Sequence, residues 1–512
     1  MTSSFHGLET SRRALTVYNT AMLTVGHNVA NANTEGYSRQ RVQMSATRPI
    51  EAPGFMRSVA PGQLGTGVQT DEIVRVRDRL VDVQYRRENA FLGEWTVRES
   101  TLQSLEELIN EPSATGLSAV MNQFWNAWEA LNRDPALLSA RIEVIGKGKA
   151  LTETLHHIGR ALTQTEADLA SNIAVKIGEA NVLIQQIAGL NDTIRRIEGL
   201  NDHANDLRDQ RDLLVDKLSA IVDVQVEELS DGTYRITAAG KQVVDGVAFT
   251  LLAAGDEAAA LSGQLAGYRK SITDVQRLRD QLNAMVDTLV RGQIRVTLPA
   301  GYVASQDIPK ADGSGVVTAG TVLTAPTEVL VDGFNGLHRL GYGLGEPPSR
   351  NIPFFTGGGP EFTIDNIEVN PAVESDTNLI AASGKFETIS GSDRPIRGNG
   401  DIAHALASLR DFRFTFTSSL TPLASGTTDD YFRAVVGNMG TLSSEATRNR
   451  TNQEALLQSA SMRRSSISGV STDEEVADLI KFQHAYAAAA RHLTAVDEML
   501  DRIINRTGLV GR

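Results

Sequence analysis

The two ends of the chain share one spacing of hydrophobic residues. In residues 4–33 and 472–505, apolar side chains recur at alternating steps of three and four. The first stripe comprises Leu8, Ser11, Leu15, Tyr18, Met22, Val25, Val29 and Ala32. The second comprises Leu479, Phe482, Tyr486, Ala489, Leu493, Val496, Leu500 and Ile503. This is the spacing of a coiled-coil seam, so the pattern predicts two long terminal helices that pair.

A polar run follows the first stripe. Residues 28–37 read Asn-Val-Ala-Asn-Ala-Asn-Thr-Glu-Gly-Tyr, and Asn and Gly best tolerate the left-handed conformation that closes a helix. The run therefore predicts a helix exit, and residues 38–75 are expected to form extended segments and loops. From about 76 to 220 the spacing is helical again, and its longest stripe, in 173–197, predicts helices packed lengthwise.

The period changes near residue 222. Val222, Val224 and Val226 alternate with polar residues, which is typical of a strand. Turn signals at Ser230-Asp231-Gly232 and Asp245-Gly246 predict hairpins in this part of the chain. A helical pattern then returns over 265–290.

Residues 291–400 differ from both flanks. They are rich in Gly, Pro, Thr and Val, and their apolar runs are short, which predicts a β-rich insertion. Helical patterns resume at 401–411, 429–466 and 473–505. Thr472 and Glu475 form a capping-box pattern at the start of the last one.

These segments predict a mainly α protein with a β-rich insertion. Its terminal helices pair as a coiled coil, a helical rod lies in the middle, and a β-rich domain lies outermost. The predicted parts are residues 1–55 with 465–512 (terminal coiled-coil domain), 56–220 with 262–290 and 401–464 (rod), 221–261 (β-hairpin segment) and 291–400 (outer domain). The ends meet only if the chain doubles back, which places the insertion far from them.

Composition narrows the class of protein. The net charge of -13 argues against a nucleic-acid partner, which needs a clustered basic surface. No apolar run reaches the roughly eighteen residues of a membrane span, so no membrane insertion is expected. The first residues open no apolar segment of a Sec signal peptide. The absence of cysteine excludes disulfides and thiolate sites. It fits a cysteine-poor cytosolic protein and also a protein that crosses a membrane unfolded.

The sequence offers no catalytic or metal constellation. His156 and His157 are adjacent, so on a helix they diverge by about 100° and rarely share one ion. His484 and His492 lie too far apart on one helix to chelate a metal locally. Neither a zinc-protease motif nor a phosphate-binding loop motif is present. We therefore predict a protein that is not an enzyme, with no catalytic residue, no cofactor and no metal.

One charged cluster is denser than usual. Asp209, Arg211 and Asp212 lie within the segment 205–212. They fit a solvated helix face with charge pairs at helical spacing. A role in salt bridges between subunits is the less favoured alternative.

The helix exit carries a resemblance to a known family. The core Asn-x-Ala-Asn-x-Asn-Thr-x-Gly-Tyr at 28–37 resembles bacterial flagellar axial proteins. With Gly26-His27 before it and Ser38-Arg39-Gln40 after it, the run resembles the flagellar hook-associated protein 1 (FlgK) family. The segment 468–486 and the run Val496-Asp497-Glu498-Met499-Leu500 resemble the same family. Shorter matches lie at Glu111-Pro112-Ser113, 116–118, 205–212 and 244–246. The insertion at 291–400 matches nothing recognised.

The resemblance implies a structural subunit at the junction between flagellar hook and filament, outside the cell. Terminal helices of that family line an inner tube, and its members leave the cell by type III export without a Sec signal. Implied partners are a ring of copies of the chain, the hook protein, the second hook-associated junction protein and a cytosolic chaperone that holds the C-terminal helix at about 465–505.

We expect assembly contacts along both stripes and the exit. The expected residues are Leu8, Leu15, Tyr18, Met22, Val25, Asn28, Asn31, Asn33, Gly36, Tyr37, Leu479, Phe482, Tyr486, Leu493, Val496, Leu500 and Ile503. Small and polar residues such as Ser11, Ala32 and Ala489 interrupt the stripes, so the isolated pair is expected to be marginal and to order when neighbours bury it.

Three other functions compete with this one. Another axial protein, either the hook protein or the second junction protein, shares the short motif but fits the Ser-Arg-Gln extension and the length less well. An exported protein with an enzymatic or binding insertion at 291–400 would need site motifs that the sequence does not supply. An unrelated coiled-coil secreted effector has no need of the Asn-rich exit.

Overall fold

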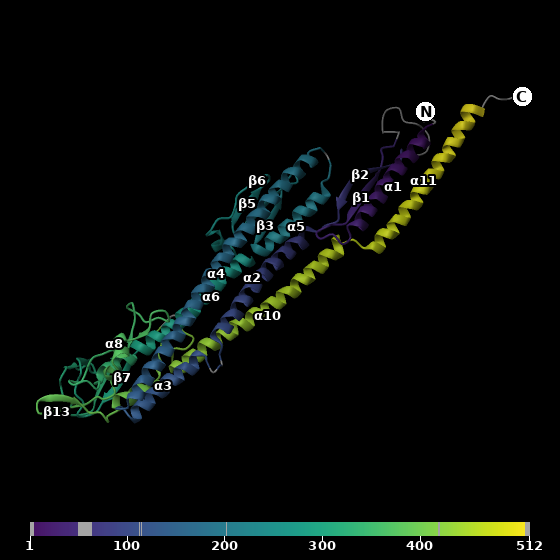
Figure 1. Cartoon of the computed structure of the whole chain (residues 1–512). Helices are drawn as coiled ribbons and strands as arrows, with labels where there is room; N and C mark the ends of the chain where they lie inside the picture. Colours follow the sequence, from purple (N-terminus) through teal and green to yellow (C-terminus); the bar gives the residue numbers. More distant parts are fainter. Residues whose placement is uncertain are drawn as a thin grey trace. The chain divides into compact units, whose positions relative to one another are not determined.

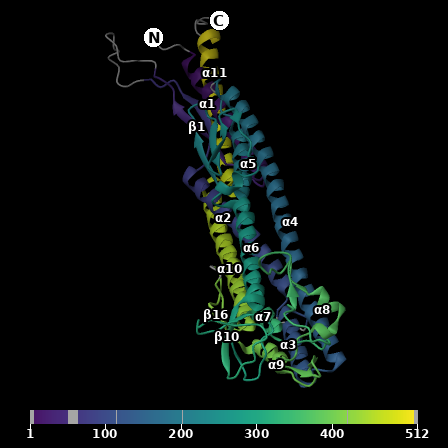
Figure 2. The same ribbon diagram turned by 90° about the vertical axis from the view of Figure 1, so that its left-hand side faces the viewer.

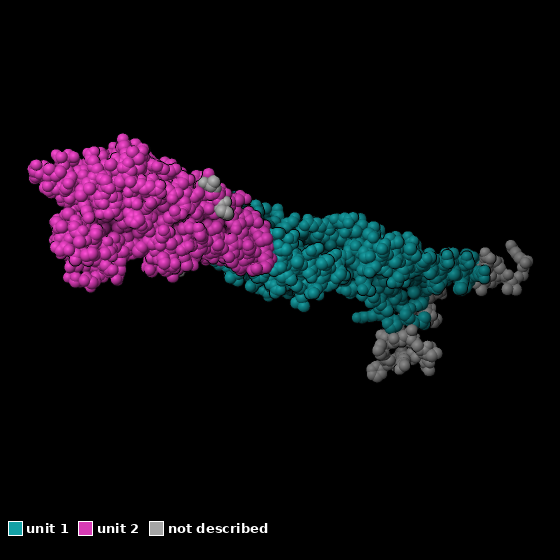
Figure 3. Space-filling model, turned by 90° about the horizontal axis from the view of Figure 1, so that it is seen from below, with its two compact units in different colours: residues 1–95, 174–267, 450–512 teal, residues 96–173, 268–449 magenta. Residues whose placement is uncertain are grey.

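The computed structural model describes residues 5–49, 64–111, 113, 115–200, 202–417 and 420–506, and these are mostly helical (Figure 1). The predicted fold class is confirmed: long helices carry both ends, and strands concentrate in two segments. Contacts divide the chain into unit 1 (1–95, 174–267 and 450–512) and unit 2 (96–173 and 268–449), coloured separately in Figure 3. The four-part division made from the sequence stays a prediction, and the parts of it at 50–63, Pro112 and 507–512 lie outside the described residues.

Unit 1 contains both ends of the chain. Its elements are α1 (His6–Ala30), β1 (Gln40–Ala46), β2 (Val68–Arg75), α5 (Asn205–Ile221), β3 (Val224–Glu228), β4 (Tyr234–Ala238), β5 (Lys241–Asp245), β6 (Ala248–Phe249), a 3₁₀ turn (Asp256–Ala259) and α11 (Thr472–Arg506). Parts of α2 (Arg79–Ile109), α4 (Leu138–Glu198), α6 (Gly263–Arg291) and α10 (Thr428–Ser468) also belong to it. β1 and β2 pair antiparallel with a bulge at Gln43/Met44.

Two details of the helix ends differ from the prediction. The residue after α1, Asn31, has φ -102°, so the left-handed conformation falls only later, at Gly36 (φ 81°). α11 is capped by Ser471, whose Oγ accepts from the Glu474 amide at 3.5 Å, and Thr472 is already helical. The predicted capping box was wrong because the buried Glu475 side chain faces Asn28 and Arg39.

The predicted hairpins form one antiparallel sheet in the order β3-β4-β5-β6. Gly232 (φ 79°) and Gly246 (φ 62°) lie in the turns that Asp-Gly signalled. The tight turn between β4 and β5 was not foreseen: it uses Ala239 (φ 49°) and Gly240 (φ 70°), and alanine seldom adopts this conformation. The inner face of the sheet carries Ile236 and Val244, both fully buried.

Unit 2 contains the 291–400 segment and the helices around it. Its further elements are α3 (Leu117–Arg133), β7 (Gln293–Leu298), β8 (Ile308–Pro309), β9 (Val316–Val317), β10 (Thr327–Asp332), α7 (Gly333–Leu340), β11 (Phe355–Thr356), β12 (Glu368–Val369), α8 (Pro371–Ser375), β13 (Phe386–Ile389), β14 (Ser392–Pro395), α9 (Asp401–Ser408), β15 (Phe414–Thr415) and β16 (Ser425–Gly426). Strands pair in twos (β7/β10, β8/β9, β11/β12, β13/β14, β15/β16), so helices as well as strands build the insertion.

An aromatic cluster forms the core of unit 2. Phe124 and Trp128 of α3 meet Phe334 of α7, Phe354 and Phe355, and each of the five is at most 1% exposed. The rings of Trp128 and Phe354 lie 5.3 Å apart, edge to face, which aromatic pairs favour. The few aromatic residues of the chain are therefore concentrated where one unit closes its own core.

Candidate assembly interface

The two terminal helices pair side by side. Gly7 faces Val496, the Ser11 hydroxyl lies 2.7 Å from His492 Nδ1, and the ring of Tyr18 stacks on Phe482 with centroids 6.5 Å apart. Residue numbers fall on α11 as they rise on α1, so the helices are antiparallel, as Figures 1 and 2 also show. We call α1 and α11 the terminal pair; the predicted doubling back of the chain is confirmed.

Pairing covers the predicted stripe only in part. Val25, Asn28 and Leu500 are buried. The half-buried members are Leu8, Leu15, Tyr18, Met22, Asn31, Gly36, Tyr37, Leu479, Phe482, Leu493 and Val496. Tyr486, Ile503 and Asn33 are exposed, the first two by 38% and 62%. The structure therefore brings the two stripes together without closing them.

Two sets of residues on these helices were missed by the sequence reasoning. Val17, Ala21 and Thr24 are buried because α1 also contacts β1 and β2, and their steps of four and three are the signal that was available. Leu23, Val476, Ile480, Met499 and Ile504 are between 48% and 68% exposed. The terminal pair thus presents apolar side chains on its outer surface.

Asn28 is the centre of a polar cluster at the exit of α1. Its Nδ2 donates to the Gln40 carbonyl and to Glu475 Oε2, both at 2.9 Å. Its Oδ1 accepts from the Gln40 amide at 3.0 Å and from the Tyr37 hydroxyl at 2.8 Å. An asparagine side chain has two donor hydrogens and two acceptor lone pairs, so this 1%-exposed residue is fully satisfied. We call Asn28, Tyr37, Arg39, Gln40 and Glu475 the exit cluster.

Arg39 joins α10 to α11 where the helical path breaks. Its amide donates to the Ser468 carbonyl at 2.8 Å in the last turn of α10. Its guanidinium forms ion pairs with Glu475 at 2.6 Å and Glu474 at 2.8 Å in the first turn of α11. Negative charge also favours the N-terminus of α11. One residue therefore fixes the connection between the two helices.

The exit also contacts α5. The Ser38 amide donates to Asp209 Oδ2 at 2.8 Å, and Gln40 Nε2 donates to Asp206 Oδ1 at 2.6 Å. Gly36 lies against Leu213, whose Cβ would be 3.1 Å from an added Cβ. Any larger residue at position 36 would therefore meet both a left-handed backbone and a close neighbour.

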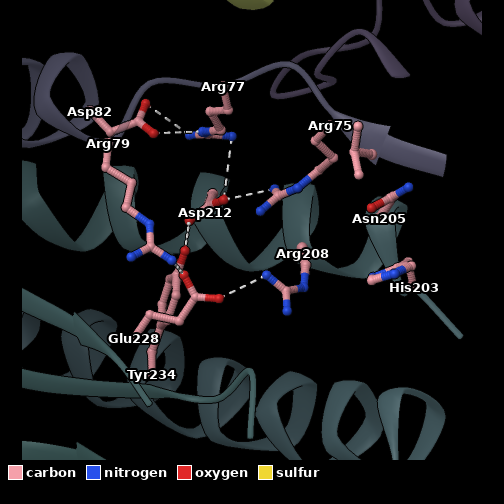
Figure 4. Close-up of a pocket in the computed structure, with 11 residues that line it drawn as sticks. Arg75, Arg77, Arg79, Asp82, His203, Asn205, Arg208, Asp212, Glu228 and Tyr234 are labelled. Atoms are coloured by element: carbon pink, nitrogen blue, oxygen red, sulfur yellow. Dashed lines mark hydrogen bonds and ion pairs between the residues drawn. The ribbon is translucent and has the colours of Figure 1, made fainter. Parts of the chain in front are cut away.

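Behind the exit lies a buried network of arginines and carboxylates (Figure 4). Arg75 pairs with Asp209 at 2.7 Å and with Asp212 at 2.9 Å, and Arg86 pairs with Asp212 at 3.1 Å and Asp216 at 2.7 Å. Burial would raise the pKa of Asp212, but Arg77, Arg86 and Arg75 hold it below its usual range. Burial also raises the pKa of Asp209, although Arg75 and Ser38 oppose this shift.

Both interpretations of the 205–212 cluster were therefore wrong. Asp209, Arg211 and Asp212 are at most 4% exposed, so they form no solvated face. The carboxylates pair with arginines of their own chain, and the Arg211 guanidinium stacks 3.4 Å above the Tyr234 ring. The arginine partners of the two carboxylates, Arg75 and Arg86, lie more than 120 positions away in the sequence, on β2 and α2.

The cavity beside this network measures about 290 Å³. Its arginines already have carboxylate partners: Arg75 with Asp212, Arg77 with Asp82, and Arg208 with Glu198 and Glu228. Arg79, which also lines the cavity, pairs with Glu228, so each of the four arginines has a carboxylate partner. Within the described residues, no group of three or more His, Cys, Asp or Glu side chains is placed to hold a metal ion, and no helix is long and apolar enough to span a membrane.

Two models of known protein families match this chain. A family model described as the flagellar hook-associated protein FlgK helical domain matches residues 102–355. Residues 464–506, which hold the end of α10 and all of α11, match the C-terminal model of flagellar basal body rod FlgEFG proteins.

Individual relatives extend over the full length. Flagellar hook-associated protein 1 of Bacillus subtilis is 32% identical over 527 positions, covering 100% of each chain. The Escherichia coli protein of the same name is 24% identical over 95% of this chain and 96% of its own. The solved flagellar hook junction protein FlgK of Burkholderia pseudomallei aligns with TM-score 0.52 at 15% identity, covering 75% of this chain and all of that one, which supports the fold.

Proposed function

Because the chain belongs to the family of flagellar hook-associated protein 1, a family of structural flagellar proteins, we propose that it forms the junction between hook and filament through its terminal pair. Its copies form a ring that contacts the hook protein on one side and the second hook-associated junction protein on the other. The half-covered stripe of the terminal pair carries this proposal.

The physical argument is that the terminal pair is incomplete in one chain. Side chains such as Ile480 (48% exposed) and Met499 (63% exposed) keep apolar surface in water. Each square ångström of such surface that a neighbour covers contributes about 25 cal/mol. Assembly therefore supplies stability that the isolated pair lacks, and the helices gain their full order when copies come together.

The same surface suits the route to the site of assembly. We propose that the chain leaves the cell through the flagellar type III channel and that a cytosolic chaperone first holds α11. An amphipathic helix with one apolar face fits a hydrophobic groove. A chain without cysteine also forms no disulfide outside the cell.

Location tests the proposed place in the flagellum. An epitope inserted at Ser390-Gly391, in the exposed turn between β13 and β14, leaves the terminal pair unchanged. Labelled flagella are expected to show a ring confined to the distal end of the hook. Label along the filament or along the whole hook would contradict the proposal.

Truncation tests the proposed mechanism. Deleting residues 473–505 should abolish assembly and chaperone binding while unit 2 stays folded. Leu493→Asp places a charge in the half-buried stripe and should have the same effect, whereas Thr494→Asp, at an exposed polar position next to it, should assemble. A truncated chain that still joins filament to hook would refute the mechanism.

A further inference from the structure

One segment of unit 2 is fastened at both of its ends by a single side chain. The fully buried His338 ring of α7 donates from Nδ1 to the Ile352 carbonyl at 2.7 Å and accepts the Ala381 amide at Nε2, 3.0 Å away. The chain between these two contacts leaves α7 and returns to it. We call residues 353–380 the strap, since this segment is closed at its base and contacts two long helices.

The strap follows one face of α4. Arg141, Gly148 and Gly159 share this face, because steps of seven and eleven residues return to the same side of a helix. Arg141 donates to two carbonyls of the strap at 3.1 and 2.9 Å. An added Cβ at Gly148 would lie 3.1 Å from the Phe354 ring. An added Cβ at Gly159 would overlap Asp365 Oδ1. Glycine weakens a helix, so α4 has glycine at the two positions where the strap leaves no room for a side chain. These contacts extend over about 27 Å of α4, at 1.5 Å per residue.

The tip of the strap is bound to α6 through its backbone. The Phe362 amide donates to Asp287 Oδ1 at 3.0 Å, and the Ile364 amide donates to Asn283 Oδ1 at 3.0 Å. Asn283 and Asp287 are four residues apart, one turn of α6, and the Ile364 side chain between the two bonds is fully buried. The tip is therefore held in one register on α6.

Arg279 of α6 is where the strap and both helices meet. Its guanidinium pairs with Asp365 of the strap at 2.9 Å. It also donates to Thr163 Oγ1 of α4 at 2.9 Å and lies 3.7 Å from Glu166. The Arg279 side chain is 18% exposed, so water and salt screen these contacts less than they would on an open surface. One cation thus joins α6 to α4 and to the strap.

The two helices bound by the strap also extend beyond unit 2. Both α4 and α6 continue into unit 1, so a load that passes along the chain is carried by them. Packed helices slide past one another at small cost, and such shear is a common motion of proteins. A third element that is bonded to both helices opposes this sliding.

We propose that the strap locks α4 to α6 and so stiffens unit 2 against the load between hook and filament. The inserted segment then serves the mechanics of the chain instead of displaying a binding module. The load rests on the proposed function, whereas the lock between the two helices does not depend on it.

Gly159→Leu in the purified full chain tests the lock. The new side chain must displace Asp365, which breaks its pair with Arg279. Gly146→Leu is the matched control, because it makes the same change on the same helix, where an added Cβ meets nothing within 4 Å. Arg279→Met repeats the test without added bulk on α4, so a folding defect of the first variant does not decide the result.

Hydrogen exchange by mass spectrometry is the measurement. In Gly159→Leu and Arg279→Met, exchange should rise about tenfold in the strap, the factor that the loss of one bond to a charged group gives. It should rise as well in residues 159–166 of α4 and 279–287 of α6, and Gly146→Leu should leave all three unchanged. Faster exchange in the strap alone would overturn the inference, because the strap would then hold no helix. Unchanged exchange in both test variants would overturn it too.

Shearing of flagella tests the load. Cells with Gly159→Leu should show the labelled ring but lose their filaments at lower shear than cells with Gly146→Leu. Equal resistance to shear, with the ring present, would refute the load-bearing role while leaving the junction role intact. If the unsubstituted chain forms no ring, the junction role fails, and hydrogen exchange in the purified chain still decides whether the strap locks the two helices.

Discussion

The aromatic core of unit 2 and the terminal pair of unit 1 bury their apolar side chains to very different extents. Phe124, Trp128 and Phe334 are fully buried among residues of their own chain. In the terminal pair, Tyr18 and Phe482 stack but remain half-buried, and Ile480 lies open. The core is finished when one chain folds, whereas we propose that the pair is finished only by its neighbours.

Replacing one aromatic side chain in each region with alanine should give the largest difference in the free energy of unfolding. Trp128→Ala leaves a cavity in a closed core and should lower the free energy of unfolding by about 3–5 kcal/mol. Tyr18→Ala removes a half-covered ring and should cost about 1 kcal/mol or less in the isolated chain. Denaturant titration of both purified variants measures the two effects. Similar losses would mean that the terminal pair is already a closed core.

Acid should act on unit 2 through His338. This fully buried ring donates from Nδ1 to the Ile352 carbonyl at 2.7 Å and accepts the Ala381 amide at Nε2, 3.0 Å away. Burial, reinforced by Arg141 and Arg339, lowers its pKa to about 4, although the bond to Ile352 opposes the shift. Between pH 6.5 and about 4 the unfolded chain therefore binds a proton that the folded chain excludes.

The folded chain therefore becomes less stable as the pH falls. Stability is full above pH 6.5 and falls as the pH drops toward 4, by about 3 kcal/mol in total. Unfolding free energies measured across this window check the loss. His338→Gln keeps a donor and an acceptor but does not titrate. The unfolding free energy of this variant should therefore fall by about 3 kcal/mol less than that of the unmodified chain across the same pH window. An unchanged slope in this variant would assign the acid sensitivity to other groups.

Asn28 provides the matching test in the terminal pair. Asn28→Asp keeps the shape but replaces two donor hydrogens with a charge that faces Glu475, and a buried group left unsatisfied costs about 1–3 kcal/mol. Hydrogen exchange in α1 and the start of α11 should accelerate, while exchange in unit 2 stays unchanged. Asn33→Asp is the control, since Asn33 is exposed. Equal exchange in the two variants would show that the exit cluster does not hold the pair.

The spacing of apolar residues was enough to predict the helices but not which elements cover their apolar faces. Steps of three and four located the stripes of α1 and α11, because a helix repeats its faces locally. The same reasoning missed Val17 and Ala21, since the β1–β2 hairpin that covers them is formed by a later part of the chain. A stripe shows that a face is apolar, but not how many neighbours it has.

The charged residues were harder to interpret than the apolar ones. The charged segment that contains Asp209 and Asp212 has the composition of a surface helix. The pairing of these two residues with Arg75 and Arg86 explains their burial. Glu475 looked like half of a capping box but bonds Asn28, 447 positions away. Polar residues acquire their roles from tertiary partners, which local spacing does not contain.

Replacing exposed apolar residues should change the stability of the isolated chain least, but in the assembly it should distinguish the terminal pair from unit 2. Ile480→Ser changes a side chain that is 48% exposed, so the unfolding free energy should move by about 0.5 kcal/mol or less. Ile389→Ser, in β13 of unit 2, changes one that is 43% exposed and should behave alike. In assembled flagella the two variants should differ. Ile480→Ser should yield fewer filament-bearing hooks, because a neighbour buries that surface, whereas Ile389→Ser should assemble normally. Counting filaments per hook by electron microscopy decides it, and equal counts would mean that the open face of α11 stays open in the assembly.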